Sequence, residues 1–313
     1  TSSAFTTWAW DFGDGNTGNT KNPTHIYGLV SATTTYTVQL IVTTPFGTST
    51  AIQNNYITVF PGIYTWSVSS GDWTTPTSWS PSRVTPSISD VLIFNGSVIS
   101  QATVSNVTTQ TIRQLQVING CTTIWSSNTN SNLTTGIASA PGLSFFVGAN
   151  SQLILTGIND ITIQLPSYSQ GTVNGDVVFD QSFNGGNGAK DFLASATAGG
   201  IVFTSGATFQ NAASARGNLG NPFGAGTANS IIFQSGSAYY HSGTKTTHIA
   251  GNGGDPFALV APASIVVFQP GSLFYVYDMA HMSNFNGSTV GNLTFDDRVG
   301  TSNIGGALPL YIY

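Results

Sequence analysis

Two carboxylates near the N-terminus stand in the stretch WAWDFGDGNTG, Trp8 to Gly18. Asp11 and Asp14 are close enough in sequence to contact a calcium ion, to act as an acid/base pair, or to form a turn. Two carboxylates are too few for a full oxygen cage around calcium unless backbone carbonyls help. Asp and Gly also tolerate tight turns, and Asp side chains bond nearby backbone N–H groups. We therefore interpret Asp11 and Asp14 as turn formers, with a calcium contact as the alternative and no catalytic role.

The second half of the chain holds few other groups that could do chemistry. The densest charge group is Asp296-Asp297-Arg298, which we interpret as a solvated turn or cap. Asp278 and His281 could lie on one side of a short turn, and His241 and His248 flank a Thr-rich loop. None of them has the spacing of a strong metal motif, and the chain has no Ser-His-Asp order, P-loop or dinucleotide fingerprint. We expect no catalytic residue, no resident metal or cofactor beyond the calcium alternative, and no enzymatic activity.

The composition narrows the function further. Charged residues make up 6% of the 313 residues, and the net charge is −5 with seven Lys and Arg, which argues against a nucleic-acid partner. No apolar run approaches the roughly 18 residues of a membrane helix. The single Cys121 excludes an internal disulfide framework, and its place in a repeat described below predicts a buried core thiol. The abundance of Thr, Ser, Asn, Gly and β-branched residues predicts an all-β protein.

The first sixty residues alternate like half-buried strands. Apolar residues recur at every second position in Tyr36, Val38, Leu40 and Val42. The stretch TPFGTS then interrupts the run as a hairpin turn would, and a second alternation begins at Ile57. This pattern is typical of a β-sandwich.

These residues resemble the PKD family, an immunoglobulin-like sandwich common in surface proteins. The resemblance rests on Trp10-Asp11-Phe12-Gly13-Asp14-Gly15, then Pro23, His25, Tyr27 and Tyr36-Thr37-Val38. It implies a partial PKD-like β-sandwich over residues 1–61. A PKD domain normally has further strands before the Trp-Asp-Phe-Gly-Asp-Gly segment, so we expect these to come from a preceding segment or from another chain.

Residues 62–90 form a junction rich in Trp and Pro. Its aromatic and proline residues are Trp66, Trp73, Trp79, Pro76, Pro81 and Pro86. The arrangement looks like the opening segment of β-solenoid modules in bacterial surface adhesins. We interpret the three Trp side chains as a cap on the open end of a stacked core. The alternative is that exposed rings stack on sugar faces, since Trp combines a large apolar area with a polar handle.

A seven-residue template recurs from residue 91 onward. FTSGATF, FQSGSAY and FQPGSLF begin at Phe203, Phe233 and Phe268, and each has Gly three residues after its first aromatic. A relaxed template also begins at Ile93, Val117, Val147, Val177 and Leu293. The third-offset residue is always Gly, Asn or Asp, the types that accept a left-handed backbone. The template recurs every 24 to 35 residues, which predicts a right-handed parallel β-helix of about eight rungs over residues 91–313. The competing fold is a large β-sandwich or jelly roll, which would explain the alternation of apolar residues but not the recurring template.

The long loops of these repeats are Gly-rich and low in complexity. They span residues 184–192, 215–229 and 242–257, and any binding site is expected there.

The combination resembles the giant adhesin-like proteins that Bacteroidota export by the type IX secretion system, some of which serve gliding motility. It implies a non-catalytic segment of a large secreted or cell-surface protein that serves adhesion or forms an extracellular filament. The expected partners are neighbouring domains, copies of the same protein and surface glycans. The alternative is a polysaccharide-binding or polysaccharide-cleaving β-helix with PKD as an accessory module. A third hypothesis completes the sandwich with a strand from the next subunit.

Overall fold

The chain consists of strands and turns. The computed structural model describes residues 6–28, 30, 34–59, 62–138, 141–181, 193–212, 222–224, 227–241, 243–245, 256–257, 263–277, 289–295 and 311–312. Within these ranges there is no α-helix, only one 3₁₀ helix, η1 (Pro76–Ser78), and no helix there could cross a membrane. The chain divides into two compact units, Thr1–Gly62 and Ile63–Tyr313. The prediction of an all-β protein is confirmed.

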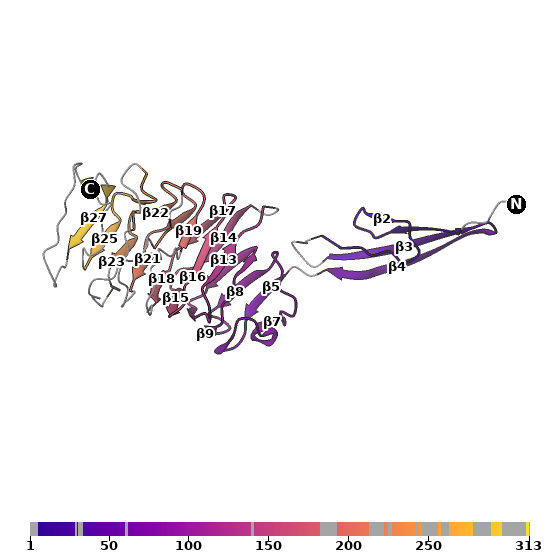
Figure 1. Ribbon diagram of the computed structural model, residues 1–313, viewed down its shortest axis with the longest axis horizontal. Coiled ribbons are helices and arrows are strands. Elements are labelled where there is room, and N and C mark those ends of the chain that lie inside the picture. Colours follow the sequence, from indigo (N-terminus) through magenta and orange to yellow (C-terminus); the bar gives the residue numbers. More distant parts are fainter. Residues whose placement is uncertain are drawn as a thin grey trace. The chain divides into compact units, whose positions relative to one another are not determined.

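The N-terminal unit holds one antiparallel sheet with the strand order β2-β1-β3-β4. Its strands are β1 (Thr7–Asp11), β2 (Thr17–Gly18), β3 (Thr34–Thr44) and β4 (Gly47–Val59). The hairpin expected at TPFGTS joins β3 to β4, with Thr44 paired to Gly47 (Figure 1). In the described part of this unit the strands make one layer, whereas the sandwich predicted from the sequence needs two.

The register of this sheet separates two kinds of side chain. Trp10 pairs with Leu40, while Asp11 pairs with Gln39. Because successive residues of a strand point to opposite faces, one face carries aromatic and aliphatic side chains and the other carries a mixture of polar and small apolar ones.

The second unit is built from three parallel sheets that the chain visits in turn. The first sheet contains the parallel strands β5 (Ile63–Trp66), β8 (Val91–Asn95), β11 (Gln114–Ile118), β14 (Gly142–Val147), β17 (Ser169–Val173), β20 (Ile201–Phe203), β22 (Ile231–Phe233) and β24 (Val266–Phe268). The second contains β6 (Ser70–Asp72), β9 (Gln101–Ser105), β12 (Thr122–Trp125), β15 (Gln152–Gly157), β18 (Asp176–Gln181), β21 (Thr208–Asn211), β23 (Ala238–His241), β25 (Leu273–Val276) and β27 (Asn292–Phe295). The third contains β10 (Gln110–Ile112), β13 (Ser131–Thr135), β16 (Ile161–Leu165) and β19 (Leu193–Ser195).

Three short strands complete the description of this unit. β7 (Trp79–Ser80) pairs antiparallel with β5 at the outer edge of the first sheet. β26 (Thr289–Val290) and β28 (Tyr311–Ile312) form a parallel pair of their own. We call one strand of the first sheet together with the second-sheet and third-sheet strands that follow it a rung. Successive rungs lie side by side in chain order (Figure 1).

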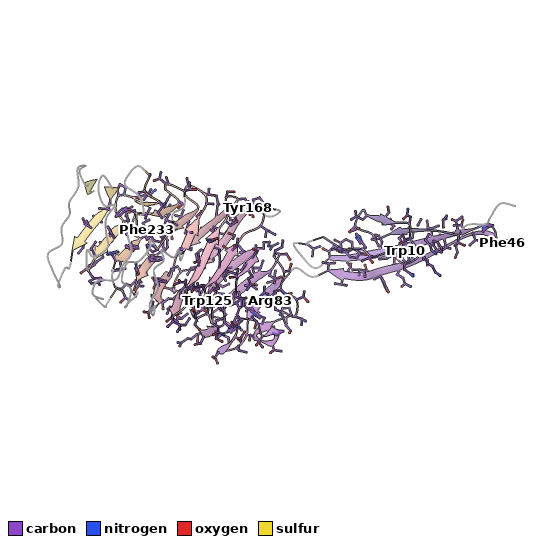
Figure 2. All side chains as sticks on the ribbon, in the orientation of Figure 1. Trp10, Phe46, Arg83, Trp125, Tyr168 and Phe233 are labelled. Carbon is purple, nitrogen blue, oxygen red and sulfur yellow. The ribbon has the colours of Figure 1, made fainter. Side chains whose placement is uncertain are left out.

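Inward-facing side chains stack directly from rung to rung. The paired positions of one such column are Phe94, Val117, Val147, Val173, Phe203, Phe233 and Phe268. Each of these side chains is buried, and the rings of Phe203 and Phe233 stack with centroids 4.5 Å apart. Figure 2 shows Trp125 and Phe233 among the side chains of this unit. The core is therefore one continuous stack, because each rung covers the apolar side chains of the next.

The structure confirms the template at its strongest matches. Gly206, Gly236 and Gly271 follow the three Phe residues at the expected offset, and each has φ between 80° and 86°. Only a residue without a Cβ adopts that left-handed conformation at no steric cost.

Three of the five weaker template matches are wrong in register, whereas those at Val117 and Val147 align with Phe203 in the inward column. Val177 and Leu293 lie in the second sheet, where they pair with Phe209 and Phe274. In the rung that contains Val173, only Asn174 and Gly175 connect the first-sheet strand to the second-sheet strand. The seven-residue template does not fit this short connection, so it matched the following strand instead. The match at Ile93 is one residue early, because Phe94 is the residue that pairs with Val117.

The parallel sheets also begin earlier than residue 91. Strands β5 and β6, in the predicted junction, pair in parallel with β8 and β9. The junction of residues 62–90 therefore contributes strands to the stack, and Trp66 lies next to Phe94 in the inward column, with ring centroids 5.6 Å apart.

Candidate functional site

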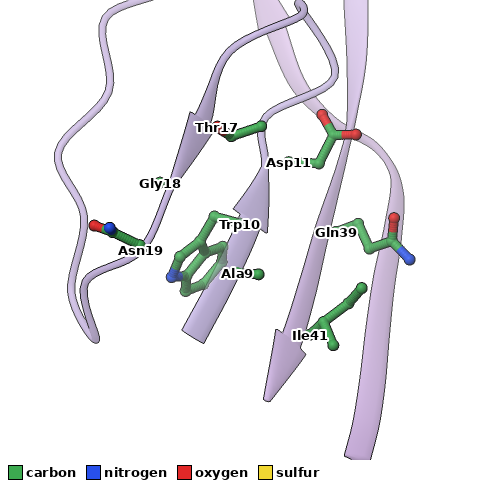
Figure 3. A pocket seen from close by; sticks show the side chains of 8 residues that line it. All are labelled: Ala9, Trp10, Asp11, Thr17, Gly18, Asn19, Gln39 and Ile41. Atoms are coloured by element: carbon green, nitrogen blue, oxygen red, sulfur yellow. The ribbon is translucent and has the colours of Figure 1, made fainter. Parts of the chain in front are cut away.

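A pocket opens on the sheet of the N-terminal unit (Figure 3). It has a volume of about 550 Å³. Its lining comes from three adjacent strands and the residue after β2: Ala9, Trp10, Asp11, Thr17, Gly18, Asn19, Gln39 and Ile41. Pairing between β1 and β3 brings together residues that are far apart in the sequence.

The register of the strands explains which side chains share this pocket. Ala9 pairs with Ile41, and Asp11 pairs with both Gln39 and Thr17. Alternate residues of a strand point to the same side, so these five side chains project to one face of the sheet. The pocket thus combines a small apolar area with a polar rim.

Asp11 also shapes the turn that follows β1. Its Oδ1 accepts a hydrogen bond from the backbone N–H of Gly13 at 2.8 Å. Gly13 has φ of 82°, and a Cβ there would clash with the carbonyl oxygen of Thr37. The turn therefore requires glycine for its backbone angle and for the close approach of β3.

Asp14 is held by nitrogen donors on both oxygens. Its Oδ1 accepts from the backbone N–H of Asn16 at 3.1 Å, and its Oδ2 lies 2.8 Å from Nε2 of His25. Burial acts to raise the pKa of Asp14, but hydrogen bonds from His25 and Asn16 outweigh it and the pKa is lowered. In the ranges that the structure describes, no three His, Cys, Asp or Glu side chains gather into a metal site.

A row of rings continues from this contact between Asp14 and His25. Phe12 stacks on His25 with centroids 4.1 Å apart, and His25 meets Tyr27 edge-on at 4.7 Å. Tyr27 then stacks on Tyr36 and donates its hydroxyl hydrogen to the carbonyl oxygen of Phe12. These contacts pin the segment between β2 and β3 to the sheet.

The three Trp residues of the junction are buried. Trp66, Trp73 and Trp79 are at most 2% exposed, and Nε1 of Trp79 donates to the carbonyl oxygen of Trp73. Their rings pack on one another and on Phe94, and Trp73 also contacts Trp125. This corrects the sugar-stacking alternative: no ring face is open to solvent, because the first rungs need these large side chains to fill the end of the core.

Beside this Trp cluster lies an ion pair that sequence reasoning missed. Nε of Arg83 donates to Oδ2 of Asp90 at 2.7 Å, and both side chains are almost fully buried. The guanidinium also donates to Gln110 and lies 5.7 Å from the ring centre of Trp79. The available signal was an Arg and an Asp seven positions apart in a region with almost no other charge.

The remaining predicted residues fall into two groups. Cys121 is buried, as expected, and burial raises the pKa of its thiol to about 11. His241 is buried with Nδ1 3.4 Å from the hydroxyl of Tyr239. The other candidates lie outside the described residues: His248, Asp278, His281, Asp296, Asp297 and Arg298.

The loops expected to carry a binding site are described only in part. Residues 184–192 lie outside the described ranges, as do most of residues 215–229 and 242–257. In the described piece of the last loop, Nζ of Lys245 lies 2.8 Å from Oδ1 of Asp176. That carboxylate also accepts from the hydroxyl of Thr208, so this part of the loop is fastened to the second sheet.

Comparison with known proteins gives one match. No curated protein matches the chain, and no solved structure matches it. The family model of the PKD domain matches residues 1–59, the segment that holds the Asp11–Asp14 turn, the row of rings and the pocket. The resemblance seen in the sequence is thus confirmed for this segment, and the N-terminal unit carries a PKD domain.

Proposed function

We propose that the chain is a non-catalytic segment of a large secreted or cell-surface bacterial protein, which serves attachment or forms an extracellular filament. The observation that carries the proposal is the continuous stack of parallel strands from β5 to β24. Such a stack grows along one direction by adding rungs, and each rung contacts only its neighbours. An architecture of that kind suits a stalk or spacer.

We further propose that residues 63–313 form a right-handed parallel β-helix. The chain returns to the same sheets in the same order, which supports a helical path. Crossovers between parallel strands are right-handed in nearly all proteins, which supports the handedness.

The PKD match supports an extracellular location, since PKD domains are typical of extracellular and surface proteins. The resemblance of the whole arrangement favours a Bacteroidota protein exported by the type IX secretion system, with gliding motility among its roles. The neutral exterior expected from a chain with 6% charged residues suits repeated weak contacts with glycans or neighbouring chains better than charge-steered binding.

The test is electron microscopy of the native cell surface combined with the mass of the intact polypeptide that carries this segment. We expect a long surface fibre, or a polypeptide many times heavier than 32.6 kDa. A compact soluble protein of this mass would overturn the proposal. It would direct attention to polysaccharide cleavage, assayed with variants of Asp278, His281 and Asp296.

A further inference from the structure

The pocket of the N-terminal unit has a chemically mixed lining. Ala9 and Ile41 form an apolar area, and Ile41 is only half-buried although it lies in the middle of a strand. Four polar side chains surround it: Asp11, Thr17, Asn19 and Gln39. Oδ1 of Asp11 accepts a hydrogen bond from the backbone N–H of Gly13, and the Asp11 side chain remains exposed.

The hydrogen-bond donors and acceptors of this rim are complementary to adjacent hydroxyl groups of a ligand. The carboxylate of Asp11 only accepts, the amides of Asn19 and Gln39 both donate and accept, and the hydroxyl of Thr17 does either. A sugar hydroxyl likewise donates and accepts at once, so adjacent hydroxyls can bond to these groups in pairs. The C–H face of a sugar ring would then cover the apolar area of Ala9 and Ile41, where burial of apolar surface is favourable.

Charge narrows the class of ligand. The lining contains one carboxylate and no Lys, Arg or His. An anionic ligand would meet the carboxylate of Asp11 without a compensating cation, which is unfavourable because like charges repel. A divalent cation would find one carboxylate where several oxygen ligands are needed. A neutral, polyhydroxylated ligand satisfies the rim without either conflict.

We propose that this pocket binds a neutral sugar residue of a surface polysaccharide. Its volume of about 550 Å³ lies within the range of small-molecule sites. The inference deepens the proposed role in attachment and rests on it, because it names the ligand class that the surface protein would hold. It also moves the glycan site from the buried Trp cluster of the second unit to the sheet of the first.

Calorimetric titration of the 313-residue chain with cellohexaose, maltohexaose and mannohexaose tests the proposal, with hexagalacturonate as the acidic comparison. We expect at least one neutral hexasaccharide to bind with a Kd in the millimolar range or lower. Hexagalacturonate should bind at least about tenfold more weakly, the equivalent of losing one or two hydrogen bonds. No binding of any neutral hexasaccharide, or equal binding of the acidic one, would overturn the proposal.

Three variants connect the binding to the pocket. Gln39→Ala should raise the Kd about tenfold. Gln53→Ala is the matched control: the same residue type, exposed on the next strand and outside the pocket, and it should leave the Kd unchanged. Asp11→Asn keeps an oxygen that can accept from Gly13, so the turn should persist while the preference for neutral over acidic sugar falls. Thermal unfolding of each variant checks that it folds.

If Gln39→Ala and Gln53→Ala bind sugar as the parent does, the pocket is not the site and the inference is wrong. This outcome differs from failure of the proposed function. A short, non-surface polypeptide that still binds neutral sugar through Gln39 would contradict the surface role and leave the sugar site standing.

Discussion

The two units differ in how they bury the apolar side chains of their sheets. In the N-terminal unit, Phe12 is the one hydrophobic residue among the described positions that is buried, and Ile26, Phe46, Ile52 and Tyr56 are exposed. In the second unit, the core is an unbroken cluster that runs from Trp66 to Val290.

This difference indicates which contacts stabilise each unit. A flat sheet needs a second layer to bury its apolar face, so the described part of the first unit depends on local contacts such as the Asp14–His25 pair. In the second unit the parallel sheets enclose a common interior, so each rung supplies the cover for its neighbours. Substitutions should therefore have large effects in the second unit and small, local ones in the first.

The largest contrast is expected between two phenylalanines. Phe233→Ala removes a fully buried ring that stacks between Phe203 and Phe268, and it should lower the free energy of unfolding of the second unit by about 3–5 kcal/mol. Phe46→Ala, at a position 99% exposed in the β3–β4 turn (Figure 2), should change stability by less than about 0.5 kcal/mol. Urea unfolding of both variants is followed by alkylation of the buried Cys121, which reports the second unit, and by circular dichroism of the whole chain, which includes the first unit. Equal effects of the two variants would contradict the contrast.

The buried ion pair should rank second. Asp90→Ala leaves the guanidinium of Arg83 buried without its carboxylate and should cost about 3 kcal/mol. The double variant Arg83→Met with Asp90→Leu should be less destabilised than the single one, because no unpaired charge remains. Chemical denaturation of all three proteins measures this. If the double variant is destabilised as much as Asp90→Ala or more, the unpaired buried charge is not the cause of the loss.

A smaller effect is expected at the turn of the first unit. Gly13→Ala forces a Cβ against the carbonyl oxygen of Thr37 at a positive φ and should cost about 1–3 kcal/mol. Gly15→Ala, which has a similar φ but open space around it, should cost about 1 kcal/mol. The melting temperature of the N-terminal unit, measured for both variants, distinguishes the two effects. Equal losses would mean that the backbone angle, and not the contact with β3, sets the requirement.

The smallest effect is a pH dependence confined to the first unit. Because the folded pKa of Asp14 lies below its ordinary value of 3.8, its contribution to stability is complete above that value and is lost as the pH falls through the lowered pKa. Unfolding of the first unit between pH 2 and 5 should therefore become easier on acidification, and Asp14→Asn should weaken this dependence. An unchanged acid profile in Asp14→Asn would place the dependence on other groups.

The sequence predicted the strand-rich architecture and the residues that terminate strands, because glycines at left-handed positions such as Gly206 and Gly236 leave a recurring signature. It did not predict the rungs at Trp66 and Val173. Those rungs turn without the seven-residue template, and their strands are recognised only through pairing with Phe94 and Phe203.

The candidate site was harder to predict than the fold. The turn residues Asp11 and Asp14 lie three positions apart with Gly13 between them, so residue type alone indicated a turn. The pocket depends on the pairing of Asp11 with Gln39, and Gln39 has no local signal that distinguishes it from other polar strand residues. The burial of Trp66, Trp73 and Trp79 agrees with their interpretation as a cap, but the sequence did not predict that β5 and β6 join the stack.

Because neighbouring strands pair one to one, the length of the second unit can change without a change in the contacts between rungs. From Phe203 to Phe233 and on to Phe268, each rung repeats the same side chain and the same backbone partners. Duplicating a gene segment of this kind would add one strand spacing, about 4.8 Å, without creating a new kind of contact. Evolution can therefore set the reach of such a molecule by counting repeats, while the first unit keeps its own chemistry unchanged.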